Sequence, residues 1–284
     1  MIWKMKRKAL DLARRGEVMG VLNVTPDSFS DGGRFTDTEA AVRCGMEMAA
    51  QGAGILDVGG ESTRPGSAAV PAGTECARTV PVIRSLRERW DGLISIDTSK
   101  AEVAAAALGA GADIVNDVTG LLGDPEMEGV CRAAECGVVV MHMQGDPRTM
   151  QVAPRYADVV EEVRIFLQKR FESLAGAGFD PERLCFDPGI GFGKTLKHNL
   201  ELLRHLEKLA PKGRPLLLGV SRKSFIAKLL GNEDMSAREW PTVAVTAYAR
   251  ESGARVFRVH SVKENLEALR MVEAICSKPK QRRN

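Results

Sequence analysis

Several features that define other classes of protein are missing from this sequence. It has no run of about 18 apolar residues, so we expect no membrane-spanning helix. The formal net charge is only +3, which does not suggest a surface for nucleic acid or a membrane. The basic residues 1–16 lack the apolar centre and small-residue cleavage site of a signal peptide. We therefore expect them to cover one end of the folded protein.

Cysteine and histidine are also sparse and unpaired. The chain has six cysteines, none in a CxxC pair, and four histidines, none in an HExxH motif. These spacings exclude the usual signatures of a disulfide scaffold and of a zinc site. We expect reduced thiols and a cytoplasmic protein.

What the 284 residues do contain is one pattern repeated eight times: an apolar run, a polar loop, then a stretch of helical periodicity. Most runs lack two-residue alternation, which is typical of strands buried on both faces. Three or four such units could equally form an open sheet, but eight in this length favour a closed barrel. Predicted strands cover residues 18–24, 55–58, 93–96, 113–116, 138–141, 184–186, 215–220 and 255–259.

The predicted fold class is therefore α/β, a single-domain (β/α)8 TIM barrel. We expect residues 1–17 to form an N-terminal extension packed on the barrel, residues 18–276 the barrel itself, and residues 277–284 a flexible tail. Such barrels place their active sites at the carboxyl ends of the strands. The residues at those ends are Asn23, Asp57, Asp97, Asn116, His142, Asp187, Ser221 and Arg258.

Three of these residues, Asp97, Asn116 and Asp187, suggest a site for a flat heterocycle. A carboxylate in a dry site must accept hydrogen bonds, and a 2-amino-4-oxopyrimidine edge presents neighbouring N–H donors. An amide donates and accepts together, which suits a mixed edge. The alternative is that each residue caps the helix that follows it, and Asp97 before Thr98 is a plausible N-cap.

Cations gather after the last two strands. The seventh strand leads into Ser221-Arg222-Lys223-Ser224 and the eighth into Arg258-Val259-His260-Ser261. Barrels frequently bind phosphate at these two loops, so we expect an anion pocket there. A solvated basic loop is the alternative.

Long loops follow the first, second and sixth strands. Residues 23–33 and 59–66 are candidate lids over the site, with Phe29 near the tip of the first. Residues 189–195 resemble a phosphate-binding loop, but GxxxxGK[ST] needs glycine where the chain has Pro188. A tight turn that approaches a flat ligand is the better interpretation.

Taken together, the loops resemble those of the dihydropteroate synthases, the pterin-binding barrel family. The resemblance runs in the family's order from residue 18 to residue 262, and one departure is Ser261, where the family usually has aspartate. The matching motifs are residues 23–33, 60–66, 96–98, 116–118, 141–145, 187–194, 221–224 and 258–260.

The resemblance implies a transferase of folate biosynthesis. Such an enzyme joins (7,8-dihydropterin-6-yl)methyl diphosphate to 4-aminobenzoate, releases pyrophosphate and forms 7,8-dihydropteroate. It also implies Mg²⁺ as cofactor, a homodimer, small-molecule substrates rather than nucleic acid or membrane, and a target for sulfonamides.

The resemblance assigns roles to individual residues, grouped here by ligand. Asn23, Lys223, Arg258 and His260 would be catalytic. Asn23, Arg258 and His260 would hold the diphosphate, with Mg²⁺ bound through Asn23. The pterin would contact Asp97, Asn116, Asp187, Lys223, Met141 and Gly219. The aminobenzoate pocket would comprise Thr63, Arg64, Pro65, Phe192 and Ser224, and Phe29 and Asp31 would close over it as a lid.

Three other functions remain open at this point. A methyltransferase acting on a methylated folate shares the barrel and the acids that hold the pterin, but needs no diphosphate pocket. An aldolase-type lyase would use Lys223 as a Schiff-base amine. A pterin carrier would bind the pterin without chemistry. Release of pyrophosphate from the pterin diphosphate distinguishes the transferase from all three.

Overall fold

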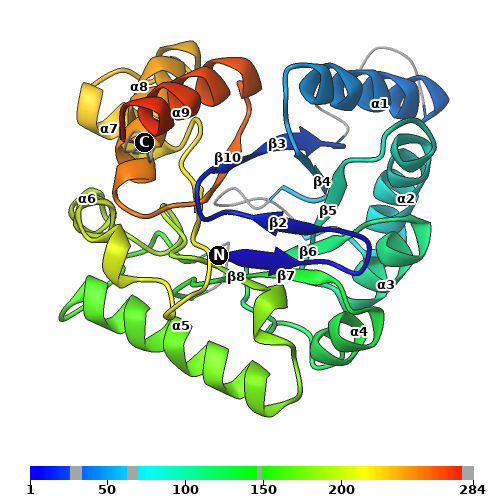
Figure 1. Cartoon of the computed structure of the whole chain (residues 1–284), viewed down its shortest axis with the longest axis horizontal. Helices are drawn as coiled ribbons and strands as arrows, with labels where there is room; N and C mark the ends of the chain where they lie inside the picture. The colour runs from blue at the N-terminus through cyan, green and yellow to red at the C-terminus, as the bar shows by residue number, and fades with distance from the viewer. Residues whose placement is uncertain (26–33, 63–68, 146–148, 277–284) are drawn as a thin grey trace, which may run out of the picture.

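Eight parallel strands form a ring enclosed by helices in the computed structural model of the chain (Figure 1). The structure describes residues 1–25, 34–62, 69–145 and 149–276, with only the backbone of residues 34–37. The strands are β3 (Glu17–Asn23), β4 (Ile55–Gly59), β5 (Leu93–Asp97), β6 (Ile114–Asp117), β7 (Gly137–Met141), β8 (Leu184–Asp187), β9 (Leu217–Gly219) and β10 (Val256–Val259).

The strand order is that of a barrel. Neighbours run β8-β7-β6-β5-β4-β3-β10-β9, and a single parallel bridge between Phe186 and Leu216 joins the two ends. The Phe186 N–H also donates to the carbonyl oxygen of Pro215 at 3.0 Å. The predicted TIM barrel is confirmed, although β9 is shorter than predicted.

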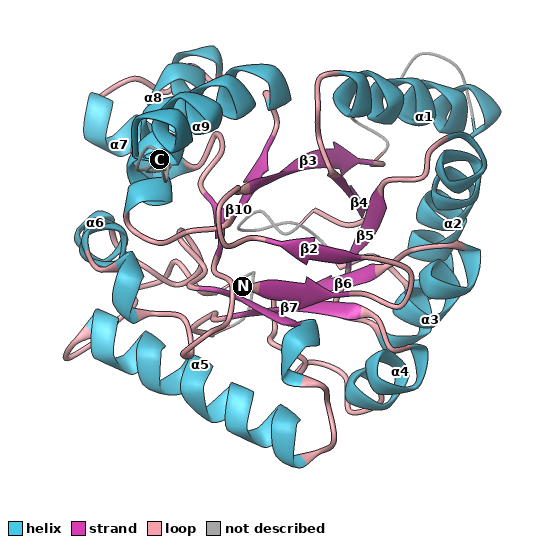
Figure 2. Cartoon of the chain, viewed as in Figure 1, coloured by secondary structure: helices cyan, strands magenta, loops and turns pink. Residues whose placement is uncertain are grey.

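Helices follow every strand of the ring, and two follow β9 (Figure 2). They are α1 (Arg34–Ala50), α2 (Ala72–Arg89), α3 (Ala101–Ala110), α4 (Met127–Ala134), α5 (Val159–Gly176), α6 (Leu196–Arg204), α7 (Ser224–Leu230), α8 (Glu239–Glu251) and α9 (Val262–Cys276). Short 3-10 turns lie at Pro181–Arg183, Leu206–Lys208 and Ser236–Arg238. None of the helices in the described ranges is long and apolar enough to cross a membrane.

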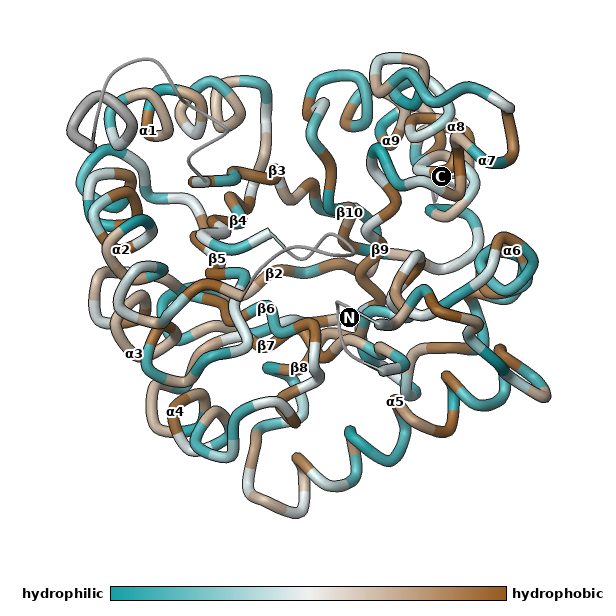
Figure 3. The backbone as a smooth tube through the Cα atoms, turned by 180° about the vertical axis from the view of Figure 1, so that it is seen from behind, coloured by the Kyte–Doolittle hydropathy of each residue, from teal (hydrophilic) through white to brown (hydrophobic). Residues whose placement is uncertain are grey.

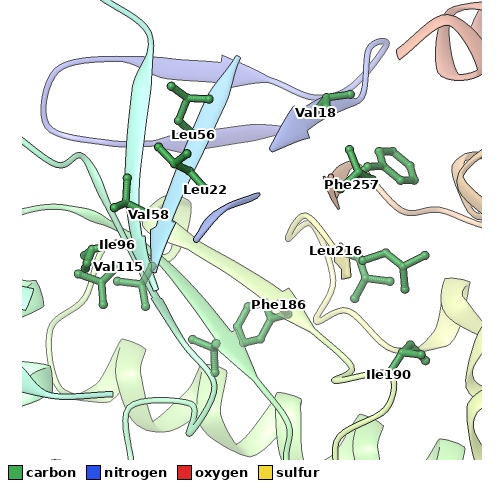
Figure 4. Close-up of a cluster of buried hydrophobic side chains, with 14 of the residues drawn as sticks. Val18, Leu22, Leu56, Val58, Ile96, Val115, Phe186, Ile190, Leu216 and Phe257 are labelled. Atoms are coloured by element: carbon green, nitrogen blue, oxygen red, sulfur yellow. The ribbon is translucent and has the colours of Figure 1, made fainter. Parts of the chain in front are cut away.

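Alternate residues of each strand face two different apolar layers. In β4, Leu56 belongs to the large buried cluster shown in part in Figure 4. The same cluster contains helix residues such as Val82 and Leu86, so Leu56 faces outward. Ile55, one residue earlier, belongs to a second cluster inside the barrel. Figure 3 shows the matching pattern in the helices, where hydrophobic and hydrophilic residues alternate along α5. Each fully buried leucine or isoleucine contributes about 1.5–3 kcal/mol.

A hairpin of β1 (Ile2–Lys4) and β2 (Ala9–Asp11) lies across the amino end of the barrel (Figure 1). Trp3 is fully buried against the inner cluster, and its indole N–H donates to the Arg183 carbonyl oxygen at 2.9 Å. This large ring fills the amino end of the barrel interior. The polar inward-facing residues lie at the opposite, carboxyl end.

Candidate active site

Inward-facing polar side chains meet at the carboxyl ends of β3 to β6. The parallel register places Asn23 beside Gly59, Gly59 beside Asp97, and Asp97 beside Asn116. A methyl group built on Gly59 would lie 3.7 Å from Asn23 Oδ1 and 3.8 Å from Asp97 Oδ2. The amide oxygen and the carboxylate therefore border a shared space above a residue that has no side chain.

The other half of the ring supplies an acid and two cations. A methyl group built on Gly219 of β9 would lie 3.8 Å from Arg258 Cβ, from Asp187 Oδ2 and from Lys223 Nζ. Met141 pairs with Asp187 in the strand register. The structure thus brings together, around Gly219, residues that are far apart in the chain.

Arg258 is held by two acids across the barrel. Its Nε donates to Asp57 Oδ2 at 2.6 Å, and its Nη2 donates to Asp97 Oδ2 at 2.7 Å. Burial opposes the charged form, but Asp57 and Asp97 hold the pKa of the Arg258 guanidinium above its ordinary value. Nη1 has no hydrogen-bond partner among the described residues, so one end of a fixed cation is left for a ligand.

Asp97 uses only one of its carboxylate oxygens to contact Arg258. Its Oδ1 is buried and has no hydrogen-bond partner in the part of the chain that the structure describes. Burial raises the pKa of Asp97 to about 7, with Arg258 opposing the rise and Asp57 adding to it. A buried acceptor without a partner is costly unless a ligand N–H satisfies it.

The helix-capping alternative for the acids is wrong. Helix α3 begins at Ala101, and the Ala101 N–H donates to Asp124 at 2.9 Å rather than to Asp97. The helix after Asp187 is capped by Thr195, whose hydroxyl accepts from a backbone N–H in its first turn. Neither Asp97 nor Asp187 therefore caps the helix that follows it.

Asp187 and Lys223 are a second acid and base at the mouth, both next to Gly219. The Gly189 N–H donates to Asp187 Oδ1 at 2.7 Å. Burial raises the pKa of Asp187, against the influence of Lys223. Lys223 Nζ donates to the Ile190 carbonyl at 2.5 Å and lies 4.6 Å from the centroid of the Phe192 ring. Burial lowers the pKa of Lys223 to about 8, with Asp187 opposing.

Lys194 is a buried residue to which the sequence analysis gave no role. Its Nζ lies 3.0 Å from His142 Nδ1, 3.4 Å from the His142 carbonyl oxygen and 2.9 Å from the Phe192 carbonyl oxygen. These three acceptors match the three N–H donors of an ammonium group. Burial lowers the pKa of Lys194 to about 7 and that of His142 to about 3. The signal in the sequence was a lysine at the end of a glycine-rich loop, which the sequence predicts to be a tight turn near a flat ligand.

His260 is oriented by Ser221. The Ser221 hydroxyl lies 2.9 Å from His260 Nδ1 and accepts from the His260 backbone N–H at 3.2 Å. Ser261, the departure from the family pattern, donates instead to Glu239 at 2.6 Å, and that carboxylate also binds Arg222. Ser221, and not Ser261, therefore orients His260.

The remaining predicted residues are placed less fully. Ser224 is exposed and is the first residue of α7. Five predicted residues lie outside the described residues: Phe29, Asp31, Thr63, Arg64 and Pro65. Just before the second gap, Glu61 binds Lys100, whose Nζ also donates to the fully buried Glu75 at 2.6 Å.

Comparison with known proteins identifies the family. A family model described as pterin binding enzyme matches residues 19–260. Escherichia coli dihydropteroate synthase is 46% identical over 277 residues, which is 97% of this chain and 96% of that protein. The chain belongs to the dihydropteroate synthase family. The Synechocystis dihydropteroate synthase is 44% identical over 265 residues, covering 93% of this chain and 92% of that protein.

Solved dihydropteroate synthases share the fold. The Xanthomonas albilineans dihydropteroate synthase with 4-aminobenzoic acid superposes with a TM-score of 0.91 at 44% identity, covering 98% of this chain and 99% of that one. The Yersinia pestis enzyme in a sulfonamide drug complex gives 0.91 at 42% identity, covering 98% and 100%. The chain is therefore a transferase with the architecture of this family.

Proposed function

We propose that this dihydropteroate synthase family member uses the residues at the barrel mouth to join the methylene diphosphate of a dihydropterin to 4-aminobenzoate. The observation that carries the proposal is the meeting of Asp97, Asp187 and Arg258 at one end of the ring. Structures of the Xanthomonas albilineans relative with 4-aminobenzoic acid and with 7,8-dihydropteroate support it.

The acids and the amide hold the pterin ring in this proposal. Asp97 Oδ1 and the Asp187 carboxylate accept from the ring N–H groups, and a ligand there removes the cost of unsatisfied buried oxygens. The Asn116 Nδ2 donates to Asp57 at 3.1 Å, so its Oδ1 is left to accept from the ligand. Lys223 donates to the pterin carbonyl and ring nitrogen, above the backbone of Met141 and Gly219.

The cations hold the diphosphate. Arg258 offers Nη1 and keeps its charge because Asp57 and Asp97 stabilise it. His260, oriented by Ser221, would contact the diphosphate beside Arg258. A fixed guanidinium needs no reorganisation when charge develops on the leaving group, which is the main source of electrostatic catalysis.

Mg²⁺ fits the same end of the site. Mg²⁺ prefers oxygen ligands and usually keeps waters and phosphate oxygens beside one or two protein ligands. Asn23 Oδ1 borders the open space above Gly59 and would serve as such a ligand. No cluster of three or more histidine, cysteine or acidic residues suited to a metal occurs among the described residues. A bound Mg²⁺ would neutralise part of the diphosphate charge.

The reaction requires little acid–base chemistry. The bond between the methylene carbon and the diphosphate oxygen breaks, the arylamine nitrogen bonds to that carbon and then loses a proton, and pyrophosphate leaves. Donation from the pterin ring stabilises positive charge on the methylene, so a dissociative path is favoured. Positioning of the two reactants contributes about 7–11 kcal/mol in well-oriented systems.

The aminobenzoate pocket lies beside Lys223 in this proposal. Phe192 stacks under the Lys223 ammonium and offers its ring to the arylamine, and Ser224 stands at the start of α7. Thr63, Arg64 and Pro65, with Phe29 and Asp31 as a lid, complete the pocket as the family resemblance implies. Sulfonamides, present in the Yersinia pestis complex, would occupy the same place.

A homodimer and a cytoplasmic location complete the proposal. Large apolar side chains are exposed on α7, α8 and the turn between them, at Leu229, Leu230, Met235, Trp240 and Tyr248. Exposed apolar patches of this kind mark protein interfaces. All six cysteines are free thiols, which supports a reducing compartment.

A pyrophosphate-release assay tests the reaction. The purified chain is given the pterin diphosphate and Mg²⁺, with and without 4-aminobenzoate. Stoichiometric pyrophosphate and dihydropteroate are expected only with both substrates. Binding of the pterin without release of pyrophosphate would leave a carrier as the function and overturn the proposal.

A further inference from the structure

Asp57 is a charged residue in the middle of an otherwise apolar strand. It is fully buried, and its neighbours Leu56 and Val58 face the helices while Asp57 faces the barrel interior. The residue beside it in the register on β5 is the uncharged Ser95. A buried carboxylate is costly unless it is paired and hydrogen-bonded, so its partners indicate why it is there.

Both partners of Asp57 are residues of the candidate active site. Its Oδ2 accepts from Arg258 Nε at 2.6 Å and from Asn116 Nδ2 at 3.1 Å. Arg258 belongs to the diphosphate end of the proposed site and Asn116 to the pterin end. Asp57 is the residue that both of them contact from below.

Each of these contacts fixes an orientation. A carboxylate only accepts hydrogen bonds, so the Asn116 amide must turn its nitrogen toward Asp57 and its oxygen toward the mouth. The Arg258 guanidinium is held at Nε by Asp57 and at Nη2 by Asp97, which fixes its plane and aims Nη1 away from both acids.

We propose that Asp57 is a positioning residue that sets Asn116 and Arg258 together and thereby couples the pterin end of the site to the diphosphate end. The proposal rests on the function proposed above, since that function places the two substrate ends. Asp57 itself lies below the mouth, so it acts through its two partners and not on the reacting atoms.

The rival explanation is that Asp57 serves only as a structural counter-ion for Arg258. Asp57→Leu separates the two explanations because it keeps the approximate shape of the side chain and accepts no hydrogen bond. Arg258 Nε and Asn116 Nδ2 both donate to Oδ2, so an asparagine could keep both bonds through its amide oxygen. Leucine instead releases Asn116 and leaves Arg258 held by Asp97 alone.

A double-mutant cycle tests the proposal. The kcat and KM for the pterin diphosphate, and the affinity for the bare pterin alcohol, are measured for wild type, Asp57→Leu, Arg258→Ala and the double variant. Asp57→Leu is expected to lower kcat/KM about 100-fold and to weaken the pterin alcohol about 10-fold, as for other coupled buried networks. In the Arg258→Ala background the same change should still weaken the pterin alcohol about 10-fold, because Asn116 is still released.

Ser95→Ala is the matched control, because Ser95 lies at the same level of the barrel next to Asp57. It should keep wild-type kinetics. A change at Asp57 that has no effect on pterin alcohol affinity in the Arg258→Ala background would overturn the positioning role and leave a structural counter-ion for Arg258. A wild-type chain that releases no pyrophosphate would instead overturn the proposed function, and with it this inference.

A second cycle leaves Asp57 in place, in case Asp57→Leu does not fold. Asn116→Ala and Arg258→Ala are made singly and together. Coupling through Asp57 predicts that the double variant loses at least about fivefold less than the product of the single losses. Losses that multiply within twofold would overturn the proposal.

Discussion

At the scale of single residues, every charged group at the barrel mouth has a partner that fixes its direction. Arg258 is held by two carboxylates, Lys223 by the Ile190 carbonyl, and Asp187 by the Gly189 N–H. A site arranged in this way before the ligand arrives needs little reorganisation to stabilise charge.

Asp187 gives the first prediction. Asp187→Asn should weaken binding of the bare dihydropterin alcohol about 100-fold, because a donor amide would face the N–H donors of the pterin. Titration calorimetry measures the affinity. Asp124→Asn, in an exposed loop at the same end of the barrel, is the control. Unchanged affinity in Asp187→Asn would remove this residue from the pterin site.

Lys194 gives a prediction about pH. Its pKa is lowered by burial from 10.5 to about 7, so between pH 7 and 10 the unfolded chain binds more protons at this side chain than the folded one. Stability from this group therefore rises with pH across that window. Lys194→Met removes the rise.

Denaturation at several pH values measures the effect. The difference in the free energy of unfolding between wild type and Lys194→Met should increase by up to about 1.4 kcal/mol per pH unit from pH 7 to 10. If this difference stayed constant from pH 7 to 10, a lowered pKa for the buried Lys194 would be contradicted.

The sequence predicted the residues at strand ends but not their mutual contacts. Asp97, Asn116 and Asp187 could be found because each follows an apolar run directly. The contacts of Lys194 could not be predicted, because they depend on the position of His142, which strand register sets. Asp57 stood in the list of strand ends without a role, since its role requires a view across the barrel.

At the scale of elements, the loop after β8 is locked against the end of β7. Gly189 has a φ of +66°, and a methyl group built on it would lie 1.9 Å from the His142 carbonyl oxygen. The loop carries Phe192 and Lys194 directly after this contact. Only glycine meets both the backbone angle and the close approach.

Gly189→Ala should therefore do more than strain the backbone. We expect a loss of several kcal/mol in stability and a raised KM for 4-aminobenzoate, because the loop must move away from β7. Gly231→Ala is the matched control, since Gly231 has a φ of +64° with no atom within 4 Å of the added methyl. It should lose only about 1–2 kcal/mol and keep the KM. Equal changes in stability and KM for the two variants would contradict a role for the contact between Gly189 and His142.

Element boundaries followed from periodicity wherever the local sequence decided them. Strands β4, β5 and β7 lie within one residue of their predicted ranges. Helix α6 ends at Arg204 and is followed by a 3-10 turn, a change that apolar spacing does not record. The strands of the N-terminal hairpin were not predicted, because segments of three residues carry too little pattern.

At the scale of the whole molecule, most of the exposed large apolar side chains lie on α7, α8, α9 and the turn between α7 and α8. Helices α7, α8 and α9 stand together (Figure 1), and Trp240 on α8 is 74% exposed. A stable interface buries about 1,200–2,000 Å² in total and is rich in such aromatic residues.

Trp240→Glu should convert the proposed dimer to a monomer, because a charge would be buried at the interface. Analytical ultracentrifugation measures the mass. Ile165→Glu, on the outer face of α5, is the control and should stay dimeric. A wild-type chain that sediments as a monomer would contradict the proposed homodimer.

The filled amino end of the barrel constrains how ligands enter and leave. Because Trp3, Met5 and Leu12 fill the amino end, the proposed substrates would enter, and the products leave, at the carboxyl end. Whichever substrate binds deeper at that end would have to bind before its co-reactant. The order of substrate binding would then govern turnover together with the bond-making step.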